Sequence, residues 1–112
     1  MTEFVVLERN EQALRSICER LVREIDSTDA VRTHLAAGRK LAAIKDPIAV
    51  DYLRRVAEGR RYAAASIAIG GLERLDTPPA RAALKAATSH RNLDIANEAK
   101  RSLERLERKP RP

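Results

Sequence analysis

The stretch Leu41–Leu53, which reads LAAIKDPIAVDYL, decides the fold because it returns 31 residues later as Leu72–Leu84, LERLDTPPARAAL. Five pairs of residues at this offset are apolar or proline in both copies: Leu41 and Leu72, Ile44 and Leu75, Pro47 and Pro78, Ala49 and Ala80, and Leu53 and Leu84. The register continues beyond the stretch, since Ala68 returns as Ala99. Periods of this length are typical of stacked helical units that cannot bury their apolar faces alone. The repeat therefore predicts an all-α fold.

The composition supports helices. Leucine and alanine dominate the 112 residues, glycine is scarce, and the aromatic residues are one Phe, two Tyr and no Trp. Leucine and alanine are strong helix formers. The low aromatic content argues against base stacking on single-stranded nucleic acid, which uses aromatic side chains. A chain of this length forms one domain with a modest core.

Sequence features also bear on the compartment. The single cysteine, Cys18, excludes an intrachain disulfide and fits a reducing compartment. No run approaches the roughly 20 apolar residues of a membrane span. Phe4–Leu7 is too short for the core of a signal peptide, and Glu3 stands where a positive flank is expected. We therefore expect a soluble, cytoplasmic protein without membrane contact.

The spacing of apolar residues predicts six helices joined by short corners. Their expected ranges are 10–25, 30–44, 47–57, 60–75, 78–88 and 92–108. Phe4–Leu7 is a run rich in β-branched residues without helical spacing, so we expect residues 1–9 to form an extended N-terminal arm. Residues 10–108 then form the repeat domain, and residues 109–112 a disordered polar tail.

The corners between these helices carry recognisable signals. At Asp46-Pro47 the carboxylate accepts hydrogen bonds from the free amides of the next turn, and proline suits the first turn. The same aspartate cap followed by proline is expected at Asp76-Thr77-Pro78. The pair Gly70-Gly71 lies inside a predicted helix, where each glycine costs about 1 kcal/mol relative to alanine. A closely crossing neighbour helix is the expected compensation.

The stretch Leu41–Leu53 and its return resemble the short bacterial HEAT-like repeat of the phycobiliprotein-lyase type. That unit has an Ala-rich helix ending in Leu-x-x-Leu, an Asp-Pro corner, and then Ala-Val-x-x-Leu. Arg61 matches an arginine near the start of the longer helix, whereas Lys45 and Asp76 replace the usual glycine before the corner. The resemblance covers about residues 28–107 and implies a right-handed αα-superhelix, a HEAT-like solenoid of about six antiparallel helices. Similar repeats serve as protein-binding scaffolds, as bilin lyases and in DNA-repair glycosylases.

The sequence contains little that predicts metal or nucleophilic chemistry. Cys18, His34 and His90 lie on three separate elements, whereas a metal site needs converging ligands. Cys18 and His34 occupy repeat positions that are alanine in the other copies, so we expect both in the interior, and we expect His90 to be solvated in its corner. Gly70-Gly71 lacks the Lys-Ser/Thr of a phosphate loop. We therefore expect no enzyme activity, no metal and no cofactor.

The net charge is +6, and the whole excess lies in residues 47–112. Three basic residues 31 positions apart predict a basic stripe along successive shorter helices: Arg23, Arg54 and Lys85. A second basic set lies at or near the corners: Arg55, Arg60, Arg61 and Arg91. Both sets suit an anionic partner, either nucleic acid or an acidic protein segment. Ordinary surface charge is the alternative, since Glu19 and Asp51 are spaced to pair with Arg23 and Arg55.

Together these features predict a non-catalytic protein–protein interaction scaffold or adaptor. The alternative is a nucleic-acid-binding helical repeat that uses the basic stripe. The charged last helix is suited to cap the stack, but the first helix has no such polarity. Four apolar residues of the arm are therefore candidates for an interface: Phe4, Val5, Val6 and Leu7. They are expected to cover the first unit, to dock on another protein, or to pair two copies into a homodimer.

Overall fold

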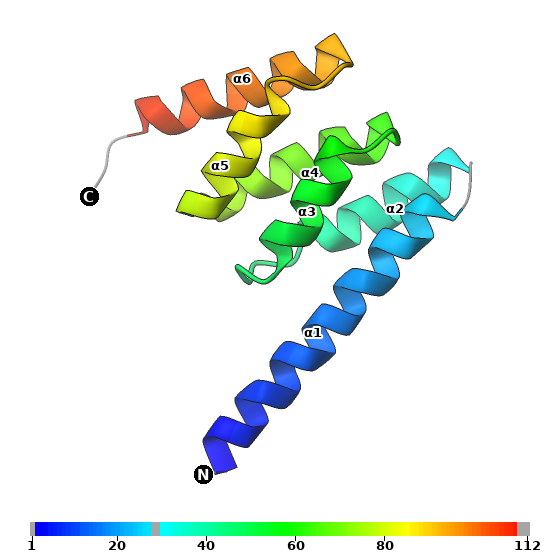
Figure 1. The fold of residues 1–112 in the computed structure, drawn as a ribbon, viewed down its shortest axis with the longest axis vertical. Coiled ribbons are helices and arrows are strands. Elements are labelled where there is room, and N and C mark those ends of the chain that lie inside the picture. Colours follow the sequence, from blue (N-terminus) through cyan, green and yellow to red (C-terminus); the bar gives the residue numbers. More distant parts are fainter. Residues whose placement is uncertain (1, 28–29, 110–112) are drawn as a thin grey trace.

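The computed structural model describes residues 2–27 and 30–109, with side chains from residue 10 onward. Over those residues the chain forms six helices and no strand: α1 (Thr2–Asp26), α2 (Val31–Ala42), α3 (Ala49–Glu58), α4 (Tyr62–Leu75), α5 (Pro78–Ala87) and α6 (Leu93–Arg108) (Figure 1). The all-α prediction is confirmed. From α2 onward the observed helices agree with the predicted ranges to within a few residues.

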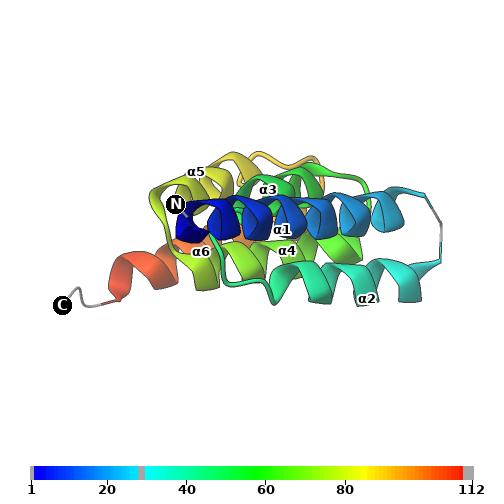
Figure 2. The same ribbon diagram turned by 90° about the horizontal axis from the view of Figure 1, so that it is seen from below.

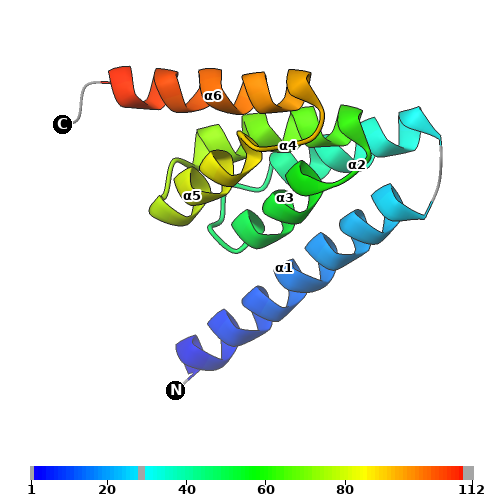
Figure 3. The same ribbon diagram turned by 45° about the horizontal axis from the view of Figure 1, so that its top comes forward.

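The helices lie in two layers. Figure 2 shows α1, α3 and α5 in one layer and α2, α4 and α6 in the other. Within each layer consecutive members are in contact, and α4 also packs against α3 and α5 of the other layer. The shortest extent of the molecule is 18 Å, which matches two helices of about 10 Å diameter each. Figure 3 shows α1 and α6 at opposite ends of this stack.

The 31-residue offset holds in space as well as in sequence. Helices α2, α4 and α6 begin at Val31, Tyr62 and Leu93, which are 31 residues apart. Side chains at equivalent positions are buried in all three units, each 5% exposed or less: Cys18, Ala49 and Ala80; Ile25, Val56 and Ala87; Ala37, Ala68 and Ala99. Small residues at these sites allow the layers to pack closely.

The predicted extended arm is wrong. Helix α1 begins at Thr2, so Asn10, expected as its N-cap, lies inside a helix of 25 residues. Val5 and Val6 lower helix propensity by less than about 1 kcal/mol each, and residues 2–9 contain no glycine or proline. A helix nucleated downstream therefore extends through them at little cost. Met1, and residues 110–112 of the predicted tail, lie outside the described part of the chain.

The two predicted Asp-Pro corners differ in detail. At the first, the amide of Ile48 donates to Asp46 Oδ1 at 2.9 Å, as expected. At the second, Thr77 is the N-cap of α5, and its Oγ1 accepts from the amide of Ala80 at 3.2 Å. Asp76 instead adopts a left-handed conformation with φ 47°, and its carboxylate accepts from Arg81 Nε at 2.6 Å. The expectation that an aspartate caps the helix at both corners was therefore wrong.

Gly71 provides the close helix crossing that the sequence predicted. A Cβ atom added to Gly71 would lie 3.1 Å from Ala42 Cα and 3.3 Å from Leu53 Cδ1. A Cβ added to Gly70 would meet only the end of the Arg74 side chain, at 3.6 Å. Gly71 thus lets α4 approach α2, whereas no described atom of another helix lies within 4 Å of a Cβ atom added at Gly70.

Two arginines 31 residues apart tie neighbouring units together. Arg74 Nη2 donates to the carbonyl of Ala42 at 3.3 Å. One unit later, Arg105 forms an ion pair at the equivalent position, with Nη2 2.7 Å from Glu73 Oε1. Each arginine therefore links its helix to the preceding helix of the same layer, α4 to α2 and α6 to α4.

Candidate anion-binding surface

The predicted stripe residues Arg23, Arg54 and Lys85 lie on α1, α3 and α5, the helices of one layer (Figure 2). Arg23 and Lys85 are exposed. Neither forms an ion pair with any residue that the structure describes. Their charges are therefore available to a partner.

Arg54, the middle member of the stripe, has its charge compensated. Its Nη2 lies 3.3 Å from Asp51 Oδ1 and its Nη1 lies 3.4 Å from Glu58 Oε2. The hydrogen bond to Asp51 and the charge of Glu58 raise the pKa of Arg54 above its usual range. Asp51 was expected to pair with Arg55 but binds Arg54 instead. The stripe is thus interrupted at its centre.

Arg55 stacks on an aromatic ring. Its guanidinium carbon lies 5.1 Å from the centroid of the Tyr52 ring, within the range of a cation–π contact. The Tyr52 hydroxyl donates to Glu19 Oε1 at 3.4 Å. Glu19 therefore contacts Tyr52 in the structure, and no ion pair between Glu19 and Arg23 is recorded in the part of the chain that is described.

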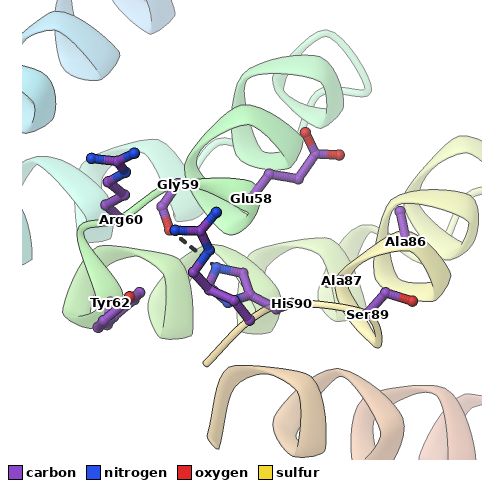
Figure 4. A pocket seen from close by; sticks show the side chains of 9 residues that line it. Glu58, Gly59, Arg60, Tyr62, Ala86, Ala87, Ser89 and His90 are labelled. Atoms are coloured by element: carbon purple, nitrogen blue, oxygen red, sulfur yellow. Dashed lines mark hydrogen bonds between the residues drawn. The ribbon is translucent and has the colours of Figure 1, made fainter. Parts of the chain in front are cut away.

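Arg60 and Arg91 lie on one concavity between two corners, which we call the corner hollow. It has a volume of about 300 Å³. Its lining comes from the α3–α4 corner, from α5 and from the α5–α6 corner: Glu58, Gly59, Arg60, Tyr62, Ala86, Ala87, Ser89, His90 and Arg91. Figure 4 shows His90 between Arg60 and Tyr62 on one side and Ala86 and Ser89 on the other. Two members of the second basic set, Arg60 and Arg91, therefore line the same hollow.

Arg55 and Arg61 line a second concavity, which we call the side hollow. Its volume is about 220 Å³, and it shares Gly59 with the corner hollow, so the two are neighbours. Arg61 Nη2 donates to the carbonyl oxygen of Asp26 at 3.4 Å, which links α4 to the end of α1. Four of the seven predicted basic residues are therefore gathered around Gly59.

His90 was expected to be solvated, and this is wrong. Its side chain is half-buried and bridges two corners. The amide of Asn92 donates to Nδ1 at 2.9 Å, so Nδ1 is unprotonated, and Nε2 carries the proton that it donates to the carbonyl of Gly59 at 3.1 Å. The ring also meets Tyr62 edge-on, with centroids 5.7 Å apart. The sequence contained one signal of this contact, since Gly59 and His90 lie 31 residues apart.

The other predicted interior residues are confirmed as buried. Cys18 is 0% exposed and His34 is 4% exposed. Burial raises the pKa of the Cys18 thiol, and the positive charge of Arg15 offsets part of this rise. Across residues 2–27 and 30–109, no three His, Cys, Asp or Glu side chains gather in a group that would hold a metal ion.

The predicted interface residues of the arm belong to α1. Phe4, Val5, Val6 and Leu7 have helical backbone, and their side chains lie outside the described part of the structure. The segment α1 as a whole contacts α2 and α3. Among the described ranges, no helix is both long enough and apolar enough to cross a membrane.

We compared the chain with known protein families, curated proteins and solved structures. No protein-family model, curated protein or solved structure matches this chain.

Proposed function

We propose that this chain is a non-catalytic protein–protein interaction scaffold, built from HEAT-like repeats coiled into a right-handed αα-superhelix. The observation that carries the proposal is the recurrence of buried residues at a 31-residue spacing across two layers of helices. Stacked units of this kind expose long surfaces that bind other macromolecules. A buried free thiol at Cys18 suits the reducing cytoplasm as its compartment.

The sizes of the two hollows that share Gly59 suit a macromolecular partner. Sites for small molecules typically measure about 300–1,000 Å³ and enclose most of the ligand. The corner hollow, at about 300 Å³, lies at the bottom of that range, and the side hollow is smaller. Hollows of this size suit single side chains of a bound protein better than an enclosed cofactor.

The proposal is tested by capturing partners with the tagged full chain from cells that produce it, with and without nuclease treatment. A protein partner that is retained after nuclease treatment supports a scaffold. Partners that are lost with nuclease favour the alternative, a nucleic-acid-binding repeat that uses Arg23 and Lys85. The absence of any specific partner contradicts both functions.

A homodimer formed through Phe4–Leu7 belongs to the same proposal. Light scattering of the full chain and of a chain without residues 1–9 tests it. A mass that halves on truncation supports the homodimer, and a monomeric mass for both proteins contradicts it.

A further inference from the structure

We infer that the corner hollow and the side hollow together bind an acidic peptide segment. This inference rests on the proposed scaffold function and names the chemistry of its partner. Arg60 and Arg91 carry the argument, because both line the corner hollow and neither forms an ion pair with a residue that the structure describes. Carboxylates pair with guanidinium groups through two parallel hydrogen bonds, which gives such contacts strength and direction.

The two hollows suit successive side chains of one extended peptide. Each measures no more than about 300 Å³, and they share Gly59. Each is lined by two arginines, Arg60 and Arg91 in one and Arg55 and Arg61 in the other. An acidic side chain placed in the corner hollow would therefore meet the guanidinium groups of Arg60 and Arg91, and one placed in the side hollow would lie beside Arg55 and Arg61.

The distribution of carboxylates favours a peptide over nucleic acid. Asp26 lines the side hollow, and Glu58, which also pairs with Arg54, lines the corner hollow, so acidic groups lie among the arginines. A nucleic acid carries a negative charge on every phosphate and would be repelled at these points. A peptide with neutral residues between its carboxylates avoids that repulsion.

The corner hollow also has an exposed aromatic ring, and hydrogen bonds hold part of its lining in place. Tyr62 is 41% exposed beside it, and exposed tyrosines are enriched where proteins bind one another. The hydrogen bonds of His90 to Gly59 and Asn92 hold the Arg91 loop against the α3–α4 corner. The site is therefore formed before a ligand arrives, which lowers the entropy cost of binding.

The test measures fluorescence anisotropy of labelled probes added to the full chain at low and at physiological salt. The probes are a peptide of alternating Glu and Gly, a Gln-Gly peptide of the same length, and a DNA duplex. We expect the Glu-Gly peptide to bind more tightly than the other two. The double variant Arg60→Glu, Arg91→Glu should weaken its binding by about tenfold or more, since charge-assisted contacts become repulsive.

Two control variants change the net charge by the same amount. Lys100→Glu with Arg101→Glu alters exposed residues of α6, and Arg23→Glu with Lys85→Glu alters the ends of the basic stripe. Both should leave peptide affinity within about threefold, because long-range screening leaves only weak effects at physiological salt. Circular dichroism and thermal unfolding check that all three double variants remain folded.

Three results would overturn the inference: no binding of the Glu-Gly peptide, an equal loss in all three variants, or tighter binding of the duplex with a loss confined to the stripe variant. Partner capture with the Arg60→Glu, Arg91→Glu protein separates this site from the scaffold function. If a partner binds the unaltered chain and the variant equally, the site is wrong and the scaffold stands. If neither protein captures a partner, the scaffold function itself fails.

Discussion

Two adjacent glycines in α4 have different surroundings and should respond oppositely to the same substitution. Gly71→Ala should destabilise the protein by about 1–3 kcal/mol, because the new methyl group would press on the backbone of Ala42. Gly70→Ala should stabilise it by up to about 1 kcal/mol, because alanine is the better helix former and space is open there. Urea denaturation of the two variants measures both effects. A similar loss in both variants would contradict the close crossing at Gly71.

The Cys18 thiol should be inert in the folded protein. It is fully buried and burial raises its pKa, so little reactive thiolate reaches solvent. A chromogenic disulfide reagent should therefore react with Cys18 only as fast as the protein opens, and immediately in urea. A protein with Cys18→Ala and Ser16→Cys is the control, since Ser16 is exposed on the same helix. Equally fast reaction of both native proteins would show that Cys18 is accessible.

At the scale of elements, His90 connects the corner before α4 to the corner before α6. His90→Ala should cost about 1–3 kcal/mol of stability, because Gly59 and Asn92 each lose a hydrogen-bond partner in a partly buried site. The neighbouring Ser89→Ala is the control, and as an exposed substitution it should change stability by less than about 0.5 kcal/mol. Thermal unfolding compares the two, and an unchanged midpoint for His90→Ala would rule out a structural role.

The contact between α4 and α6 should depend on pH. Hydrogen bonding to Arg105 lowers the pKa of Glu73 in the folded protein. A lowered folded pKa stabilises the protein above the unfolded pKa, and this stabilisation is lost as the pH falls below about 4.3. Glu73→Gln should therefore be less stable than the unaltered chain at neutral pH, with the difference shrinking in acid. Glu104→Gln, at an exposed pair with Arg108, is the control and should change stability at neutral pH by less than about 1 kcal/mol, because exposed ion pairs contribute little.

At the scale of the whole molecule, the stack should be most stable at its centre. Helix α4 packs against α2, α3, α5 and α6, whereas over the described residues α1 packs mainly against α2 and α3. Side chains 10–13 and 15–17 of α1 are exposed. Amide hydrogen exchange should therefore be slowest in α4 and faster in this part of α1, because local opening there breaks few buried contacts. Equal protection of the two helices would contradict the stacked arrangement.

The sequence predicts much of this fold because its corners are marked. Pro47, Gly59 and Pro78 mark where helices begin or end, and the 31-residue offset transfers one unit's pattern to the next. The start of α1 carries no such mark. Residues 2–9 have only a weak preference against helix, so the helix nucleated after them extends through them.

The candidate surface was predictable only in part. Arg60 and Arg91 lie 31 residues apart, and both line the corner hollow. It did not show that Arg54 is compensated, because Asp51 lies within reach of both Arg54 and Arg55 and side-chain geometry selects between them. The role of His90 depends on the tautomer of its ring and on the shape of two corners, and neither is visible in a linear pattern.

The two tyrosines give the molecule built-in optical reporters. Because the chain has no tryptophan, its emission on excitation in the tyrosine absorption band comes from Tyr52 and Tyr62. Tyr52 is 4% exposed and hydrogen-bonded to Glu19 across the interface between α1 and α3, whereas Tyr62 is 41% exposed beside the corner hollow. A neutral quencher should reach only the second ring. Without any attached dye, the unquenched emission therefore reports on the α1–α3 interface through Tyr52, and the quenched emission reports on the corner hollow through Tyr62.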